Sequence, residues 1–191
     1  LAVGYFRNFR DNTIETSAEI YYKSMQNTID FKDHAELLLN RHLEGELRFG
    51  TSYSYGLELL VRKHDGKLNG WVAYTFSRAI RTINGINNNN PFNSPYDVPH
   101  EVSIVLNYEV MPRLLISANW IYATGKPVTF PTGRAVIDGA IVPIYSDRNA
   151  YRMEDYHRLD IAVTLKPKIK ENRKFNYNIV FSAYNAYNRH N

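Results

Sequence analysis

The chain has 191 residues, including 15 Tyr, 9 Phe and 2 Trp, with a mean hydropathy of -0.43 and a formal net charge of +4. No apolar run approaches the roughly 18 to 20 residues of a membrane-spanning helix, which excludes a helical membrane protein. The absence of cysteine excludes disulfides, thiolate metal sites and thiol nucleophiles. The 23 Lys and Arg are spread among 19 Asp and Glu without a basic block, which argues against nucleic-acid binding.

Alternation of apolar and polar residues is the strongest pattern in the chain, and it predicts β-strands. In the segment 52–62, Tyr, Leu and Val occupy every second position, and the positions between them are mainly polar. A strand of this kind has one apolar and one polar face. The eight segments that carry the pattern are, in chain order, 1–9, 14–23, 52–62, 68–77, 102–110, 114–122, 158–166 and 175–182.

Short and long connections alternate between these predicted strands. The short ones, at 10–12, 63–67, 111–113 and 167–174, contain turn formers such as Asp65-Gly66. The long ones, at 24–51, 79–100 and 123–157, far exceed the usual loops of about 4 to 6 residues. Short turns on one edge and long loops on the other are typical of outer-membrane β-barrels, whose strands of about 9 to 11 residues cross the bilayer at a tilt. Abundant Tyr suits the two rims of such a barrel.

The third long connection carries the candidate ligand contacts. Within it, Asp138-Gly139 between apolar residues predicts a small hairpin. Arginine forks and tyrosine rings could grip an anionic chelate or stack on a sugar, or they could hold the loop to its neighbours. The candidate ligand-binding residues are Arg134, Tyr145, Arg148, Tyr151, Arg152 and Tyr156.

Neither a metal site nor a catalytic site is predicted. The donors in the stretch 34–42, which holds two histidines and one glutamate, are spaced too loosely for a ligand set. A serine triad could be assembled from Ser103, His100 and Asp97, but the chain has no Gly-x-Ser-x-Gly nucleophile turn. We therefore expect no enzymatic activity, no metal and no cofactor.

Six segments form a recognisable combination along nearly the whole chain: LEGELRFG at 43–50, YGLELL at 55–60, GWVAYTFSR at 70–78, YATGKP at 122–127, DYHRLD at 155–160 and YNAYN at 184–188. In this order, they resemble the C-terminal β-barrel of TonB-dependent outer-membrane receptors. The resemblance implies an all-β fold of antiparallel up-and-down hairpins, in which residues 1–191 supply about eight strands of a 22-stranded transmembrane barrel.

The same resemblance implies a function and a set of partners. Such receptors import a scarce ligand, such as an iron chelate, cobalamin or a glycan, across the outer membrane of a Gram-negative bacterium. The implied partners are outer-membrane lipid, the receptor's own N-terminal plug and, through the plug region, the TonB energy coupler. The plug and the last strands lie outside 1–191, so both ends of the chain are expected to be cuts through a longer protein.

Two other folds stay open. One is a self-sufficient eight-stranded outer-membrane barrel with a structural or adhesion role, and the other is a soluble lipocalin-like carrier. A soluble carrier would turn its apolar face inward, whereas a membrane barrel would turn it outward. We predict that one continuous outward face contains Leu57, Leu59, Ile104, Leu106, Ile161, Val163, Ile179 and Phe181.

Overall fold

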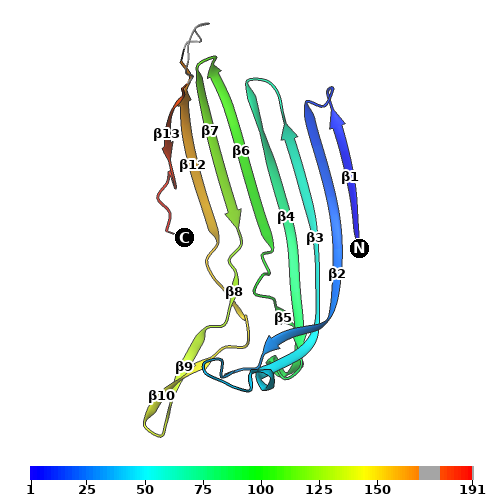
Figure 1. Ribbon diagram of the computed structural model, residues 1–191, viewed down its shortest axis with the longest axis vertical. Helices are drawn as coiled ribbons and strands as arrows, with labels where there is room; N and C mark the ends of the chain where they lie inside the picture. The colour runs from blue at the N-terminus through cyan, green and yellow to red at the C-terminus, as the bar shows by residue number, and fades with distance from the viewer. Residues whose placement is uncertain (168–176, 191) are drawn as a thin grey trace.

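The main sheet of the molecule is antiparallel, and its strands lie side by side in chain order (Figure 1). A computed structural model describes residues 1–167 and 177–190. None of the helices in these residues is long and apolar enough to cross a membrane. The expectation of an all-β fold of antiparallel up-and-down hairpins is confirmed. The strands of the main path are β1 (Ala2–Phe9), β2 (Ile14–Phe31), β3 (Leu47–Lys63), β4 (Leu68–Ile83), β6 (His100–Met111), β7 (Leu114–Ala123), β12 (Tyr156–Leu165) and β13 (Ile179–Ala183).

The remaining elements belong to the connections. The first connection ends in the 3-10 helix η1 (Leu43–Glu46). The second holds the 3-10 helix η2 (Asn87–Asn89) and β5 (Phe92–Asn93), which pairs with β4. In the third, β8 (Pro127–Val128) pairs with β11 (Tyr151–Arg152), and β9 (Pro131–Ile137) pairs with β10 (Ala140–Tyr145). The hairpin predicted at Asp138-Gly139 is confirmed, and both turn residues have a positive φ, 50° and 80°.

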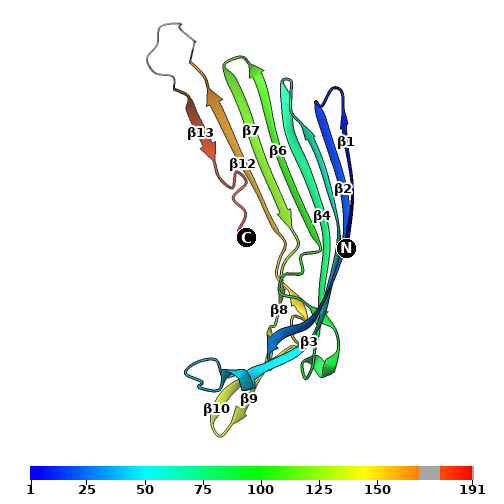
Figure 2. The same cartoon turned by 45° about the vertical axis from the view of Figure 1, so that its right-hand side comes forward.

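Short and long connections lie at opposite ends of the sheet. The turns after β1, β3 and β6 are at the upper end in Figures 1 and 2, and the connections after β2, β4 and β7 are at the lower end. The predicted alternation is therefore present in the described residues, whereas all but the first residue of the predicted short connection at 167–174 lies outside them. The eighth predicted strand, 175–182, corresponds to β13, and its first residues, Phe175 and Asn176, lie outside the described residues.

Three strands are longer than the sequence pattern predicts. β2, β3 and β4 contain 18, 17 and 16 residues, and they take up 24–31 and 47–51 of the stretch 24–51 and 79–83 of the stretch 79–100, which the pattern assigns to connections. The register of β2 against β3 shifts between Gln26 and Thr28, and the intervening Asn27 has a φ of 56°. Such a bulge moves the following side chains to the opposite face, so the alternation breaks although the strand continues.

One face of the main sheet is apolar from edge to edge. Residues opposite each other in an antiparallel pair share a face, and Val72 pairs with both Val61 and Ile104. The same relation links Val163 to its partners Ile116 and Phe181. The eight residues predicted to share a face therefore do so. The exposed large side chains on this face include Val3, Tyr5, Ile20, Tyr22, Leu59, Val61, Val72, Leu106, Ile116, Ile161, Leu165, Ile179 and Phe181.

The opposite face is polar and hydrogen-bonded between strands. Ser117 of β7 donates to Asn107 of β6 over 2.7 Å, and Asn107 donates to Asn69 of β4 over 3.2 Å. Nearer the short-turn end, Arg62 of β3 lies 3.5 Å from Glu15 of β2. The two faces therefore differ in chemistry from β2 to β7.

The sheet is open, and it buries little. Its edge strands are β1 and β13, which do not pair with each other (Figure 2). The fully or nearly fully buried apolar residues among those described are Ile83, Ile86 and Phe92, all near the long connections. Exposed apolar patches on soluble monomers rarely exceed a few hundred Å². The apolar face of this sheet therefore requires a covering medium or partner.

Candidate functional site

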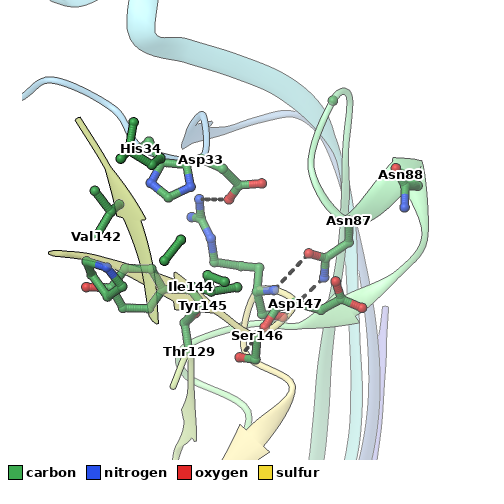
Figure 3. Close-up of a pocket in the computed structure, with 15 residues that line it drawn as sticks. Asp33, His34, Asn87, Asn88, Thr129, Val142, Ile144, Tyr145, Ser146 and Asp147 are labelled. Carbon is green, nitrogen blue, oxygen red and sulfur yellow. Dashed lines mark hydrogen bonds and ion pairs between the residues drawn. The ribbon is translucent and has the colours of Figure 1, made fainter. Parts of the chain in front are cut away.

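The three long connections meet in one open pocket of about 940 Å³ at the lower end of the sheet (Figure 3). The first connection supplies Asp33 and His34, and the second supplies Asn87 and Asn88. The β9–β10 hairpin and residues 146–148 form the remaining walls, which combine aliphatic side chains with the ring of Tyr145. Segments far apart in the sequence therefore build one concave surface.

Arg148 is the residue that joins these connections. Its guanidinium donates from Nη1 to Asp30 Oδ1 over 3.1 Å, and from Nη2 to Asp33 Oδ1 over 2.7 Å and to the Phe31 carbonyl over 3.1 Å. Its backbone N–H donates to Asn87 Oδ1 over 2.8 Å, and its carbonyl accepts from Asn87 Nδ2 over 3.2 Å. Two carboxylates thus neutralise the arginine within the protein.

Asp30 extends this network to the sheet. Its Oδ2 lies 3.4 Å from Arg81 Nη1 of β4, while its Oδ1 accepts from Arg148. Only 15% of the Asp30 side chain is exposed, so the two arginines pair with a partly buried carboxylate. The network ties the end of β2 to β4 and to the third connection.

A second network holds the base of the third connection. The Asp97 side chain is 0% exposed, and its Oδ1 accepts from Arg78 Nε over 3.1 Å and from the Ala79 N–H over 2.6 Å. Its Oδ2 is paired with Arg152 Nη2. Arg152 also donates from Nη1 to the carbonyls of Asp97 and Gly125, over 2.9 and 3.0 Å. The buried charge is therefore matched by two cations.

Asp155 joins the end of the third connection to its beginning, just before β12. Its carboxylate accepts from the Tyr122 hydroxyl over 2.6 Å and from the Gly125 N–H over 2.9 Å. These two hydrogen bonds hold the pKa of Asp155 below its ordinary value, and the bond from Tyr122 has the larger effect. A Cβ at Gly125 would lie 1.7 Å from the Met153 carbonyl oxygen, so the close approach of the two chain segments requires glycine.

The six predicted ligand contacts do not converge on one site. Tyr145 and Arg148 line the pocket, with the Tyr145 ring 6.3 Å from the His34 ring between centroids. Arg152 belongs to the Asp97 network. Tyr151 lies beside Phe130, and Tyr156 accepts from Arg158 Nη1 over 2.9 Å in β12. Arg134 is exposed on β9, and its side chain forms no hydrogen bond or ion pair with the described residues.

The pocket residues Asp33, His34 and Asn87 were not among the predicted contacts. They lie in the other two long connections, and no local pattern marks them as neighbours of Arg148. The polar character of the stretches 33–36 and 87–90 is the one sequence signal that points to them.

The serine triad considered in the sequence analysis is not formed by the described residues. His100 Nδ1 lies 2.9 Å from the Tyr74 hydroxyl, whereas Asp97 is engaged by arginines, so Ser103, His100 and Asp97 form no hydrogen-bonded triad. Within residues 1–167 and 177–190, no group of three or more His, Asp or Glu side chains could hold a metal ion.

Comparison of the chain with protein-family models, curated proteins and solved structures found no match. The physical grounds for a function are therefore an open antiparallel wall with one apolar and one polar face, and a pocket formed by its long connections.

Proposed function

We propose that the chain is part of the wall of a TonB-dependent outer-membrane receptor, which imports a scarce ligand across the outer membrane of a Gram-negative bacterium. The apolar face of the main sheet carries this proposal. Phe181 and Ile20, at 64% and 58% exposure, lie on it with tyrosines and aliphatic residues from all eight strands. Bilayer lipid is the medium that favours such a face, while the polar face suits a hydrated lumen filled by a plug domain.

The unpaired edge strands β1 and β13 favour a segment of a larger barrel over a complete small barrel. An eight-stranded barrel closes by pairing its first and last strands, and β1 and β13 are unpaired with each other. A soluble carrier encloses its apolar residues, whereas those of the main sheet are exposed. Further strands of the receptor would complete the barrel to the 22 strands that the resemblance implies.

In this proposal the pocket is part of the ligand-recognition surface. Binding residues are often placed on loops held by a rigid scaffold. Tyr145, His34 and Asn88 offer a ring, an imidazole and an amide as ligand contacts. Arg148 and Arg152 act as positioning residues that fix the loops, because carboxylates already occupy their guanidinium groups. The proposal includes no catalytic step, metal or cofactor, and energy comes from the TonB coupler through the plug.

Site-directed spin labelling tests the direction of the two faces. Residues 1–191 contain no cysteine, so single cysteines are introduced at Leu59 and Ile104 and at their neighbours Glu58 and Ser103, in a full-length receptor whose other cysteines, where present, are replaced by serine. In phosphatidylcholine vesicles, labels at Leu59→Cys and Ile104→Cys should collide mainly with dissolved oxygen. Labels at Glu58→Cys and Ser103→Cys should collide mainly with a water-soluble nickel chelate. Equal collision profiles at neighbouring positions, or a protein absent from the outer-membrane fraction, would contradict the proposal.

A disulfide crosslinking experiment distinguishes the large barrel from an eight-stranded one. If β1 paired with β13, at least one pair that combines a cysteine at Val3, Tyr5 or Arg7 with a cysteine at Ile179, Phe181 or Ala183 would come within the roughly 3.5 to 4.5 Å between Cβ atoms that a disulfide needs. We expect no disulfide under mild oxidation. The control pair Tyr5→Cys and Ala18→Cys, whose residues are register partners in β1 and β2, should crosslink.

A further inference from the structure

A second hollow lies on the apolar face at the short-turn end of the sheet. Its volume is about 360 Å³, and it is formed between the β6–β7 turn and the adjoining ends of β12 and β13. Leu165 is the central residue of its wall, because it pairs with Leu114 on one side and with Ile179 on the other. Met111, 54% exposed, adds a flexible apolar side chain at the turn. The wall of this hollow, the short-turn groove, is therefore mainly aliphatic.

Two cations line the same groove. Arg113 and Lys166 are exposed, and neither forms an ion pair with any residue that the structure describes. Their backbones are joined, since the Lys166 N–H donates to the Arg113 carbonyl over 2.9 Å. Arg113 Nε also donates to the Lys166 carbonyl over 3.1 Å, which holds the guanidinium beside the groove. Two cationic residues are thus joined through their backbones beside the groove, and neither has a counter-charge among the described residues.

We propose that the short-turn groove binds one anionic glycerophospholipid. An acyl chain would lie against Leu114, Leu165 and Ile179, and the phosphate would accept hydrogen bonds from Arg113 and Lys166. Phosphate forms charge-assisted hydrogen bonds with arginine and lysine side chains. Basic pockets between membrane-spanning elements bind lipid headgroups in this way. The inference rests on the proposed function, because an acyl chain reaches the groove only if the apolar face lies in a bilayer.

Native mass spectrometry of the full-length receptor tests the inference. The purified protein is equilibrated in mixed micelles of phosphatidylcholine and phosphatidylglycerol, and the lipid that stays bound is identified. We expect retention of one phosphatidylglycerol in preference to phosphatidylcholine. The double variant Arg113→Gln/Lys166→Gln should lose at least about fivefold of this preference, as expected from the interaction of a basic side chain with anionic lipid.

A matched control removes the same amount of positive charge from the short-turn end, but outside the groove. Arg10→Gln/Lys67→Gln removes two cations from the other short turns, away from the groove, and should retain the preference of the unsubstituted protein. Equal retention of the two lipids, an equal loss in both double variants, or a second receptor copy in place of lipid would overturn the inference. If the receptor is found in the outer-membrane fraction with oriented faces but binds no anionic lipid, the inference fails and the proposed function stands.

Discussion

Asp97 and Arg152 form an ion pair between two connections that are 55 residues apart in the chain, and the Asp97 side chain in this pair is fully buried. Arg78 of β4 binds the other carboxylate oxygen. The pair therefore anchors the third connection to the sheet through the second connection. The positions of the pocket walls depend on such long-range pairs as much as on the strands.

Replacing Asp97 by Asn should loosen the third connection. The amide oxygen can still accept from Ala79, but Arg78 and Arg152 lose their shared counter-charge, and a weakened buried charge-assisted bond costs about 1 to 3 kcal/mol. We expect faster cleavage within 124–155 by a protease added to the intact receptor. Asp147→Asn is the control, because Asp147 is in the same connection and forms no ion pair in the described structure. Equal cleavage rates for Asp97→Asn and the unsubstituted protein would refute the anchoring role.

Replacing Arg148 by Lys should separate the first and third connections. One ammonium group cannot reproduce the forked contacts to Asp30, Asp33 and the Phe31 carbonyl. The distance distribution between spin labels at Leu38→Cys and Ile141→Cys, measured by pulsed electron paramagnetic resonance, should broaden in the Arg148→Lys receptor. Arg134→Lys on β9 should leave the distribution unchanged. An unchanged distribution in Arg148→Lys would show that the positions of the pocket walls do not depend on the guanidinium contacts of Arg148.

The two faces of β12 should respond oppositely to a charge. Ile161→Arg places a guanidinium on the apolar face and should reduce barrel assembly, with a free-energy cost of about 2 to 4 kcal/mol near the bilayer midplane. Ala162→Arg, one residue along, places the same charge on the polar face and should be tolerated. Heat-modifiable gel mobility of the outer-membrane fraction measures the folded proportion. Equal assembly of the two variants would argue against a lipid-facing apolar side.

Acid should break the hydrogen bonds of Asp155 that hold the end of the third connection to the sheet. The folded-state pKa of Asp155 is lowered by the Tyr122 hydroxyl and the Gly125 N–H, so its contribution to stability is present above the unfolded-state pKa of about 4 and is lost as pH falls through the lowered value. Hydrogen exchange at the Gly125 amide should therefore be protected at neutral pH and should become faster in a pH window below about 4, relative to the intrinsic rate. In Asp155→Asn, this pH-dependent change at Gly125 should disappear. Persistence of the change in the variant would assign it to another group.

Sequence reasoning is reliable where the governing interaction is local. The side chains of a strand alternate between its faces, so spacing alone placed Leu57, Ile104 and Ile161 on one face of the sheet. The Asp138-Gly139 turn was equally predictable, because positive φ angles favour these residue types. The extension of β2 beyond Asn27 was missed because the bulge at that residue reverses the phase of the alternation.

The pocket and its networks were decided by the tertiary structure. Arg148 and Asp33 are 115 residues apart, and Arg152 and Asp97 are 55 apart, so no periodic pattern connects them. The sequence by itself determined where the strands of the main sheet lie in the chain and which residues share a face, although not the full length of β2, β3 and β4, since the alternation of side chains follows from local backbone geometry. Only the folded chain decided that Arg148 and Arg152 bind carboxylates of the protein, because an ion pair forms where strand lengths, bulges and loop paths bring opposite charges within a few ångströms in a partly buried environment.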